Sequence, residues 1–282
     1  MKNQTSKWIV ITGCSTGIGR SLVGAMRRRG WGVIATARKI ESLADLPDGE
    51  DIFRVALDVL SDESIRFAIQ QCQHLRIVGL INNAGYGQVG PLEYITTQEL
   101  KNQMDTNVIG LHRVTNYFIP ILKQNAKSGE GRIVHIASML GRVSIPLAGA
   151  YSASKHAVVS LGETLRMELA PDIKVLVVEP GAIRTELRES ATKMWGNLPE
   201  RVRGSKYDRI LHRYLALGKD ASQRWARDPD RSADKIARAV NSAHPPRRVL
   251  IGPDAHLVLI VKKFIPLSWY EALARKIYGL MD

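Results

Sequence analysis

The chain has 282 residues, of which 45% are hydrophobic and 24% charged, a composition typical of a globular protein with a sizeable core. Its two cysteines cannot form a disulfide framework and suggest a reducing, cytoplasmic compartment. The net charge of +13 favours anionic partners, but the basic residues are scattered and accompany no recognition module, so we expect no nucleic-acid partner.

Short apolar runs alternate with segments of helical period along most of the chain. The expected strands are Trp8–Thr12, Gly32–Ala37, Ile52–Ala56, Gly79–Asn82, Gly131–Ala137, Lys174–Glu179 and Arg248–Ile251. The expected helices are Gly19–Arg29, Asp62–Cys72, Thr97–Lys123, Ala153–Leu169 and Ser232–Ala243. Several strands are continuously apolar, as when both faces of a parallel sheet are covered. The alternation therefore predicts one α/β domain over 1–282, a doubly wound parallel sheet of the Rossmann type with ligands at the carboxyl ends of its strands.

The first strand leads into a glycine-rich turn. The turn reads Thr12-Gly13-Cys14-Ser15-Thr16-Gly17-Ile18-Gly19. Glycines there allow the backbone to approach a pyrophosphate closely, and the amino terminus of the next helix favours its charge. The second strand ends before Arg38 and Lys39, where an acidic residue would bind a ribose 2′-hydroxyl. Because cations suit a 2′-phosphate, we expect NADP(H) as cofactor, with NAD(H) as the alternative.

A candidate acid–base group follows the fifth strand. Tyr151 and Lys155 lie four residues apart, so they share one face of a helix. A cation beside a phenol favours the phenolate and lowers the tyrosine pKa toward the range useful for proton transfer. Ser138 ends the strand and can donate a hydrogen bond to a substrate carbonyl. The pattern predicts that Tyr151 protonates a developing alkoxide, or deprotonates an alcohol in the reverse direction, while a cofactor carries the hydride.

Taken together and in this order, these motifs resemble the short-chain dehydrogenase/reductase family, along the core from Ile9 to about Thr185. The resemblance implies further cofactor contacts at Asp58, Val59, Asn83, Ala84, Gly85, Pro180, Gly181, Ile183 and Thr185. It also implies that Asn82 to Gly85 stabilises the central sheet. Asn107 falls at the family's active-site asparagine, which would hold a water linking Lys155 to solvent. Lys155 would also bond the nicotinamide ribose.

We therefore predict an NADP(H)-dependent oxidoreductase that interconverts a ketone or aldehyde and the corresponding alcohol. The resemblance outside the core favours a hydrophobic small molecule, such as a steroid, a retinoid or an acyl-lipid ketone. The alternative is a non-catalytic dinucleotide-binding or membrane-peripheral scaffold protein with the same fold. The resemblance implies that copies of the chain can pair through the helices Thr97–Lys123 and Ala153–Leu169, and the oligomeric state stays open.

Two segments lie outside the core pattern. Residues 184–230 are rich in arginine and are predicted to form a substrate lid. Residues 254–282 read as two helices separated by Ile265-Pro266, with apolar residues flanked by lysine, arginine and aromatic residues. Such a tail suits packing on the domain or on a second subunit, and it equally suits a membrane interface.

The sequence predicts neither an export signal, nor a membrane-spanning helix, nor a metal site. The chain opens with a short polar segment, Met1 to Lys7, which is unlike a signal peptide. No apolar stretch reaches the roughly 18 residues of a spanning helix. The seven histidines show no paired spacing that suggests a metal site, and Cys14 is expected to pack in the core.

Overall fold

The computed structural model describes residues 7–184, 195–211 and 226–281. Thr185 and two parts of the predicted lid, 185–194 and 212–225, lie outside the described residues.

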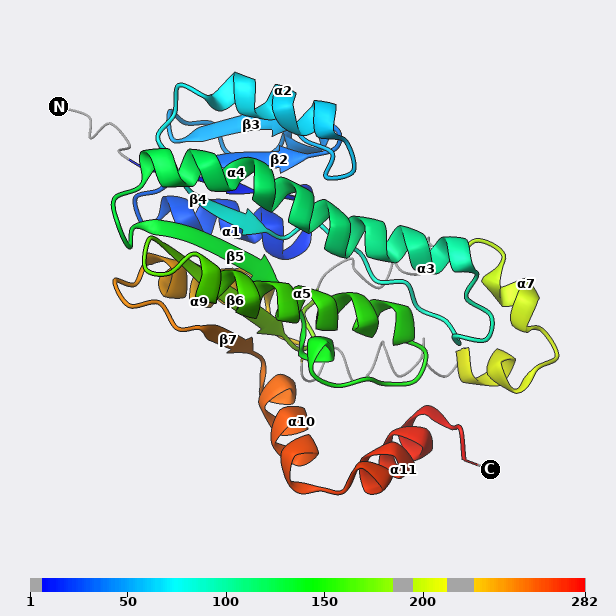
Figure 1. Ribbon diagram of the computed structural model, residues 1–282. Coiled ribbons are helices and arrows are strands. Elements are labelled where there is room, and N and C mark those ends of the chain that lie inside the picture. The colour runs from blue at the N-terminus through cyan, green and yellow to red at the C-terminus, as the bar shows by residue number, and fades with distance from the viewer. Residues whose placement is uncertain (1–6, 185–194, 212–225, 282) are drawn as a thin grey trace.

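A parallel sheet of seven strands forms the centre of the described structure, in the order β3-β2-β1-β4-β5-β6-β7 (Figure 1). The strands are β1 (Trp8–Ile11), β2 (Gly32–Ala37), β3 (Ile52–Ala56), β4 (Ile77–Asn82), β5 (Gly131–Ile136), β6 (Ile173–Pro180) and β7 (Arg248–Ile251). The strand order reverses direction between β1 and β4, which is where open parallel sheets form a crevice for a ligand. The predicted doubly wound sheet is confirmed.

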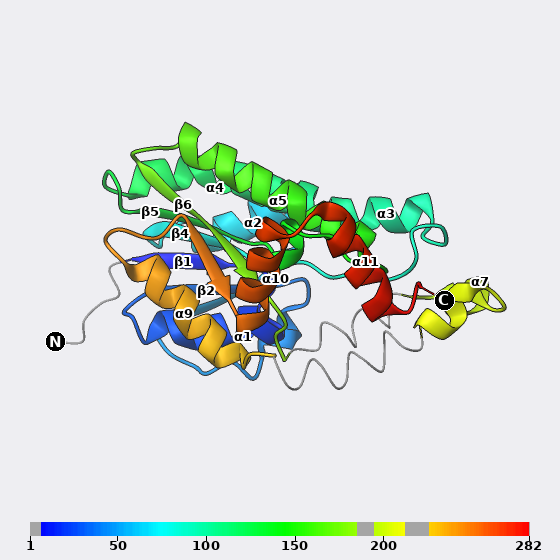
Figure 2. The same ribbon diagram turned by 90° about the horizontal axis from the view of Figure 1, so that it is seen from below.

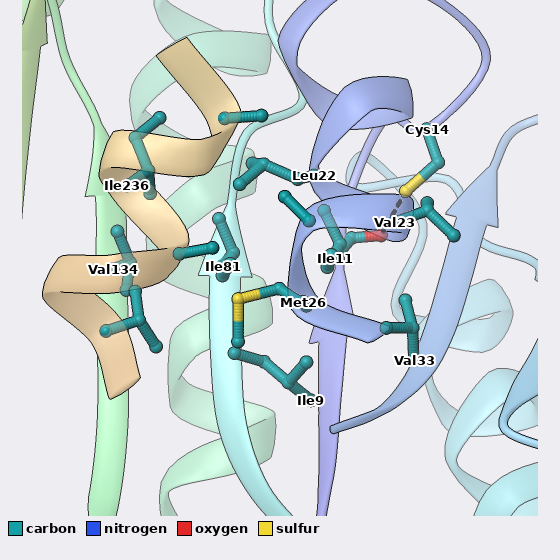
Figure 3. Close-up of a cluster of buried hydrophobic side chains, with 14 of the residues drawn as sticks. Ile9, Ile11, Cys14, Leu22, Val23, Met26, Val33, Ile81, Val134 and Ile236 are labelled. Carbon is teal, nitrogen blue, oxygen red and sulfur yellow. Dashed lines mark hydrogen bonds between the residues drawn. The ribbon is translucent and has the colours of Figure 1, made fainter. Parts of the chain in front are cut away.

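Helices cover both faces of the sheet (Figures 1 and 2). One face carries α2 (Asp62–Cys72), α4 (Leu111–Asn125) and α5 (Gly149–Glu168), and the other carries α1 (Gly17–Arg27) and α9 (Pro229–Asn241). Figure 3 shows how Leu22 and Met26 of α1 meet Ile81 of β4 and Ile236 of α9 in one apolar cluster. On the opposite face, Phe118 of α4 is almost fully buried, a side chain whose burial contributes about 2 kcal/mol.

Local sequence explains where several helices begin. Thr96 accepts a hydrogen bond from the Glu99 backbone while the Glu99 carboxylate accepts one in return, and this capping box starts α3 (Thr97–Met104). Ser61 caps α2 in the same way through the Ser64 backbone. Asp228 caps α9, whose first residue is proline.

The predicted bounds of α1 and α9 differ from the observed ones by two or three residues, and two other predicted helices differ more. The expected helix Thr97–Lys123 contains a π-helical turn, η2 (Asp105–Gly110), between α3 and α4. Helix α5 begins at Gly149, four residues before the predicted start at Ala153. The sequence gives no signal for this start, because the N-cap residue, Ala148, has no side chain that can cap the helix. Tyr151 therefore lies in the first turn of α5.

After β7 the chain leaves the sheet as a helical hairpin, α10 (Pro253–Phe264) and α11 (Leu267–Tyr278) (Figure 2). The predicted break at Ile265-Pro266 is confirmed. Among the described residues, the structure contains no helix with both the length and the apolar character needed to cross a bilayer.

Candidate active site

The predicted site residues gather around one cavity of about 570 Å³ at the carboxyl ends of the strands. Its lining includes these predicted residues: Gly13, Ser15, Thr16, Gly17, Ile18, Arg38, Asp58, Val59, Asn83, Ala84, Gly85, Ser138, Tyr151, Lys155, Pro180, Gly181 and Ile183. Residues from strand ends far apart in sequence meet here because all these strands point the same way.

The glycine turn needs its glycines for two different reasons. Gly13 and Gly17 have φ angles of +73° and +58°, a region that side chains disfavour. Gly19 has ordinary backbone angles, but a Cβ there would lie 2.2 Å from the carbonyl oxygen of Gly13. Gly19 does not line the cavity; its part is to let α1 pack closely against the turn.

Asn83 fixes the turn to the end of β4. Its Nδ2 donates to the carbonyl oxygens of Thr12 and Gly13, both at 2.9 Å. The backbone N–H groups of Asn83 and Ala84 donate to the Thr12 hydroxyl at 2.9 and 3.0 Å. Asn82 faces the other way and donates to Thr115 of α4 at 2.8 Å. The two asparagines thus connect the turn, the sheet and a covering helix.

The cavity edge near α1 suits an anionic group. Helix α1 begins at Gly17 with no acidic residue in its first turn, and the Thr16 side chain makes no capping hydrogen bond there. The free N–H groups of such a helix end favour a phosphate. Arg38 lines the cavity from the end of β2 and is exposed, and within 7–184, 195–211 and 226–281 no carboxylate is paired with it. These features fit a phosphorylated dinucleotide.

Ser138, Tyr151 and Lys155 come together on the opposite wall. The Ser138 hydroxyl caps a short 3₁₀ turn, η3 (Met139–Gly141), by accepting from the Leu140 backbone at 3.1 Å. Tyr151 and Lys155 lie on one face of α5, with the lysine Nζ 5.6 Å from the centre of the tyrosine ring. The tyrosine ring also packs against Gly87. A hydroxyl donor, a phenol and a cation therefore face one space.

Burial sets the charge state of Lys155. The side chain is 6% exposed, and its Nζ donates to the Ile136 carbonyl at 2.8 Å. Because burial penalises the charged form, the pKa of Lys155 falls to about 8. His135, fully buried on β5, has its pKa lowered to about 4, chiefly by burial and also by the nearby Lys155 charge. The neutral His135 ring lies with Nδ1 3.2 Å from the Asn82 amide.

Asn107 lies in the π-helical turn η2, beside the cavity but not in its lining. Its Nδ2 donates to the Tyr86 carbonyl at 2.9 Å and to the Ser154 hydroxyl at 3.0 Å, and its Oδ1 accepts from the Tyr86 N–H at 3.1 Å. The side chain is thus fully engaged in holding Tyr86 and α5. A water relay through Asn107 stays a prediction.

Several lining residues were missed from the sequence, among them Tyr86, and so was Asp254, which lies next to the cavity. Tyr86 lines the cavity directly after the Asn-Asn-Ala-Gly segment, and burial raises the pKa of its phenol. Asp254, at the start of α10, accepts the N–H of Ala182 at 2.6 Å and so fixes the loop after Pro180-Gly181. Its position directly after the recognised Asn-Asn-Ala-Gly segment was the signal that could have identified Tyr86. Nothing local marks Asp254, because it reaches this loop from 72 residues away.

Residues 195–211 belong to the segment that was predicted to form a lid. Trp195, Leu198 and Val202 are buried against Val89 and Leu147, in one apolar cluster. Helix α7 (Leu198–Val202) is held by an ion pair between Arg201 and Glu99 at 2.5 Å. At least this arginine of the arginine-rich segment is therefore structural. Thr185, predicted to contact the cofactor, lies outside the described residues.

Among the residues that the structure describes, no group of three or more His, Cys, Asp or Glu side chains could hold a metal ion. Cys14 is fully buried in the glycine turn, its thiol donates to the Ile11 carbonyl at 3.2 Å, and burial raises its pKa to about 12. A thiol that stays protonated is a poor nucleophile, in agreement with the packing role predicted for it.

Comparison with known proteins gives one consistent result. A family model described as short chain dehydrogenase matches residues 7–195. Retinol dehydrogenase 16 of Rattus norvegicus is 32% identical over 282 residues, covering 95% of this chain and 87% of the relative.

Solved structures agree. A short-chain dehydrogenase from Streptomyces avermitilis is 32% identical, with a TM-score of 0.75 and coverage of 98% of this chain and 99% of that one. A short chain dehydrogenase from Burkholderia cenocepacia in complex with NADP is 26% identical, with a TM-score of 0.72 and the same coverages.

Proposed function

Because the chain belongs to the short chain dehydrogenase family and is an oxidoreductase acting on CH–OH groups, we propose that it interconverts an apolar ketone or aldehyde and its alcohol with NADP(H). The observation that carries the proposal is the single cavity shared by the glycine turn and by Ser138, Tyr151 and Lys155. A nicotinamide nucleotide supplies hydride transfer when bound there. The chain's own residues supply orientation and the proton.

The proposed division of labour follows from the contacts. Ser138 orients the substrate carbonyl through its hydroxyl. Tyr151 delivers the proton to the developing alkoxide, or removes it from the alcohol in the reverse direction. Lys155, held by the Ile136 carbonyl, keeps a positive charge beside the phenol and favours its phenolate. Asn107 positions the Tyr86 wall of the cavity.

Replacing Tyr151 by Phe tests the catalytic role. We expect the oxidation or reduction rate to fall by at least about 100-fold, since a general acid contributes about that much or more, while cofactor binding stays within about two-fold. Tyr117→Phe is the matched control, because Tyr117 of α4 does not line the cavity and its hydroxyl accepts a hydrogen bond from Arg66. Rates are followed by cofactor absorbance and binding by cofactor fluorescence. Full activity in the Tyr151 variant contradicts the mechanism, whereas a parent chain that binds the cofactor and turns over no substrate favours the non-catalytic scaffold.

The cofactor preference rests on Arg38. An exposed guanidinium without a carboxylate partner in the described part of the chain suits a 2′-phosphate, and a related solved structure contains NADP. Arg38→Asp should weaken NADPH binding at least about ten-fold and leave NADH binding nearly unchanged. Lys123→Asp, at the far end of α4, makes the same charge change outside the site. Equal losses for both cofactors in the Arg38 variant contradict the assignment.

The apolar side chains of residues 195–211, in the predicted lid, support an apolar substrate. The side chains that meet in one apolar cluster are Val89, Leu147, Trp195, Leu198, Val202, Ile210 and Leu211. One relative is a retinol dehydrogenase by name. A panel of steroid, retinoid, acyl-ketone and small polar carbonyl compounds tests this directly. Efficient turnover of the small polar compounds alone would rule out the apolar class.

A further inference from the structure

The helical hairpin formed by α10 and α11 exposes a set of large apolar side chains. They are Leu257, Ile260, Phe264, Leu267, Trp269, Leu273, Ile277 and Met281. Phe264 and Trp269 are 74% and 69% exposed, respectively. Residues 257, 260 and 264 share one face of α10, and residues 269, 273 and 277 share one face of α11. Apolar residues at helical spacing normally face a core, so two solvent-facing stripes mark an interaction surface.

The exposure is not caused by detachment, because the opposite face of the hairpin is anchored to the domain. Val258, Leu259 and Tyr270 pack against the buried cluster of Leu140, Val143 and Ala148. Tyr270 donates its hydroxyl proton to the Ser144 carbonyl at 2.8 Å, and Lys262 donates to the Arg142 carbonyl at 2.5 Å. The hairpin is thus held in place with one face packed and the other face open.

Basic residues surround the apolar stripes. Residues 255–281 carry Lys262, Lys263, Arg275 and Lys276 against a single acidic residue, Glu271. A groove of about 490 Å³ beside α10 is lined by Arg142, Arg248, Leu250, His256, Leu259, Ile260, Lys262 and Lys263. Apolar and aromatic residues bordered by cations are the composition of helices that lie in the interface of an anionic membrane.

We propose that the α10–α11 hairpin docks this protein on an anionic phospholipid surface. The stripes around Phe264 and Trp269 enter the headgroup region, and Lys263, Arg275 and Lys276 meet the lipid phosphates. The hairpin lies on the membrane and does not span it, because neither helix is long enough. A second copy of the chain is the weaker occupant, since a two-fold contact through this face would bring its own cations together.

Vesicle flotation tests the proposal on the full chain. We expect binding to vesicles of phosphatidylglycerol and phosphatidylcholine, weaker binding to phosphatidylcholine alone, and release by salt. Phe264→Ser with Trp269→Ser should reduce binding to the anionic vesicles at least about ten-fold, since two large apolar groups no longer enter the interface. The matched control, Phe67→Ser with Met167→Ser, removes two side chains that are 54% and 74% exposed elsewhere and should bind like the parent chain.

The charge contribution is tested separately. Lys263→Gln with Lys276→Gln should weaken binding by roughly five-fold per lysine at low salt, and Lys101→Gln with Lys123→Gln should not. Lys262 is left intact because it anchors the hairpin. Equal binding of the parent chain to both vesicle types overturns the electrostatic part, and no binding to either overturns the proposal. Self-association that the Phe264 and Trp269 substitutions abolish, without vesicle binding, assigns the surface to a second copy instead.

Trp269 provides a direct probe of depth. Of the five tryptophans, Trp8, Trp31 and Trp195 are at most 7% exposed, so brominated lipids should quench little of their fluorescence. Trp225 lies outside the described residues and is replaced by Phe in both proteins. We expect quenching on vesicle binding in the parent chain and much less in Trp269→Phe, which keeps an aromatic anchor and so still floats. Equal quenching in both proteins places another part of the surface on the membrane and contradicts this orientation.

Discussion

At the scale of single residues, the site depends on how burial alters ordinary side chains. Lys155 is an unremarkable lysine in the sequence, and its place inside the domain lowers its pKa to about 8. The Ile136 carbonyl fixes the direction of its ammonium group. The Tyr151 ring lies on the same face of α5, one helical turn away. The pair therefore combines a helical spacing visible in sequence with an environment that is not.

The Lys155 pKa predicts how cofactor binding depends on pH. An anionic cofactor is bound better while the lysine is charged, so affinity should be highest below about pH 8 and should fall as the pH rises through that value. The measurement is the NADPH dissociation constant by fluorescence across this range. Lys155→Met should bind more weakly near neutral pH and lack the decrease. A flat profile in the parent chain contradicts a titrating Lys155.

His135 predicts how stability depends on pH. In the unfolded chain a histidine binds a proton below about pH 6.5, whereas the folded ring stays neutral to about pH 4. Acidification across this window therefore favours the unfolded state, by up to about 3 kcal/mol from this group. Chemical denaturation at several pH values measures the slope. His135→Gln should reduce it, and an unchanged slope would show that His135 is not responsible.

At the scale of elements, the cofactor end of the site is a junction between segments that are distant in sequence. Asn83 connects β4 to the glycine turn after β1, and Asp254 connects α10 to the loop after β6. The tail is thus attached to the catalytic core through its first turn. A Cβ on Gly181 would lie 2.2 Å from the Asp254 carboxylate, which shows how closely the two segments approach.

Asp254→Ala should loosen the loop after Pro180. Loss of a charge-assisted hydrogen bond costs about 1.5–3 kcal/mol, so we expect cofactor affinity to fall by roughly ten-fold or more if the loop contributes to binding. Asp254→Asn keeps an acceptor for the Ala182 N–H and should retain most of the affinity. Isothermal titration of both variants with NADPH makes the comparison. Equal losses in the two variants would point to the charge of Asp254 and not to its hydrogen bond.

At the scale of the whole molecule, a buried carboxylate ties the last strands of the sheet to their surroundings. Glu179 of β6 is fully buried and accepts from Arg142 at 3.0 Å and from Arg248 of β7 at 2.6 Å. Arg142 also pairs with Glu163 of α5. This network joins α5, β6 and β7 beneath the base of the hairpin.

Glu179→Gln should destabilise the fold without changing its shape. Removing one partner of a buried ion pair costs about 3–5 kcal/mol, and the partial exposure of both arginines places the expected loss near 3 kcal/mol. Urea denaturation measures the free energy of unfolding. Glu168→Gln, at the exposed end of α5, is the control and should change it little. A Glu179 variant as stable as its parent would mean that the two arginines are satisfied by solvent.

Pairing of two copies through α4 and α5 also belongs to this scale and stays a prediction. Analytical ultracentrifugation of the full chain without vesicles measures whether two copies pair, and the same measurement with vesicles shows whether the hairpin docks on the membrane.

The sequence by itself determined the doubly wound sheet, the family and many of the residues that line the cavity, because local patterns encode them. Continuous apolar runs specify buried parallel strands, and glycines mark the turn where the backbone angles of Gly13 and Gly17 require them. The Tyr151 and Lys155 spacing survives because both residues belong to one helix. Only the tertiary structure decided what depends on contacts between distant segments: the lowered pKa of Lys155, the attachment of Asp254 to the loop after β6, and the face of the hairpin left open to solvent. These follow from burial and close approach, which depend on how the whole chain packs.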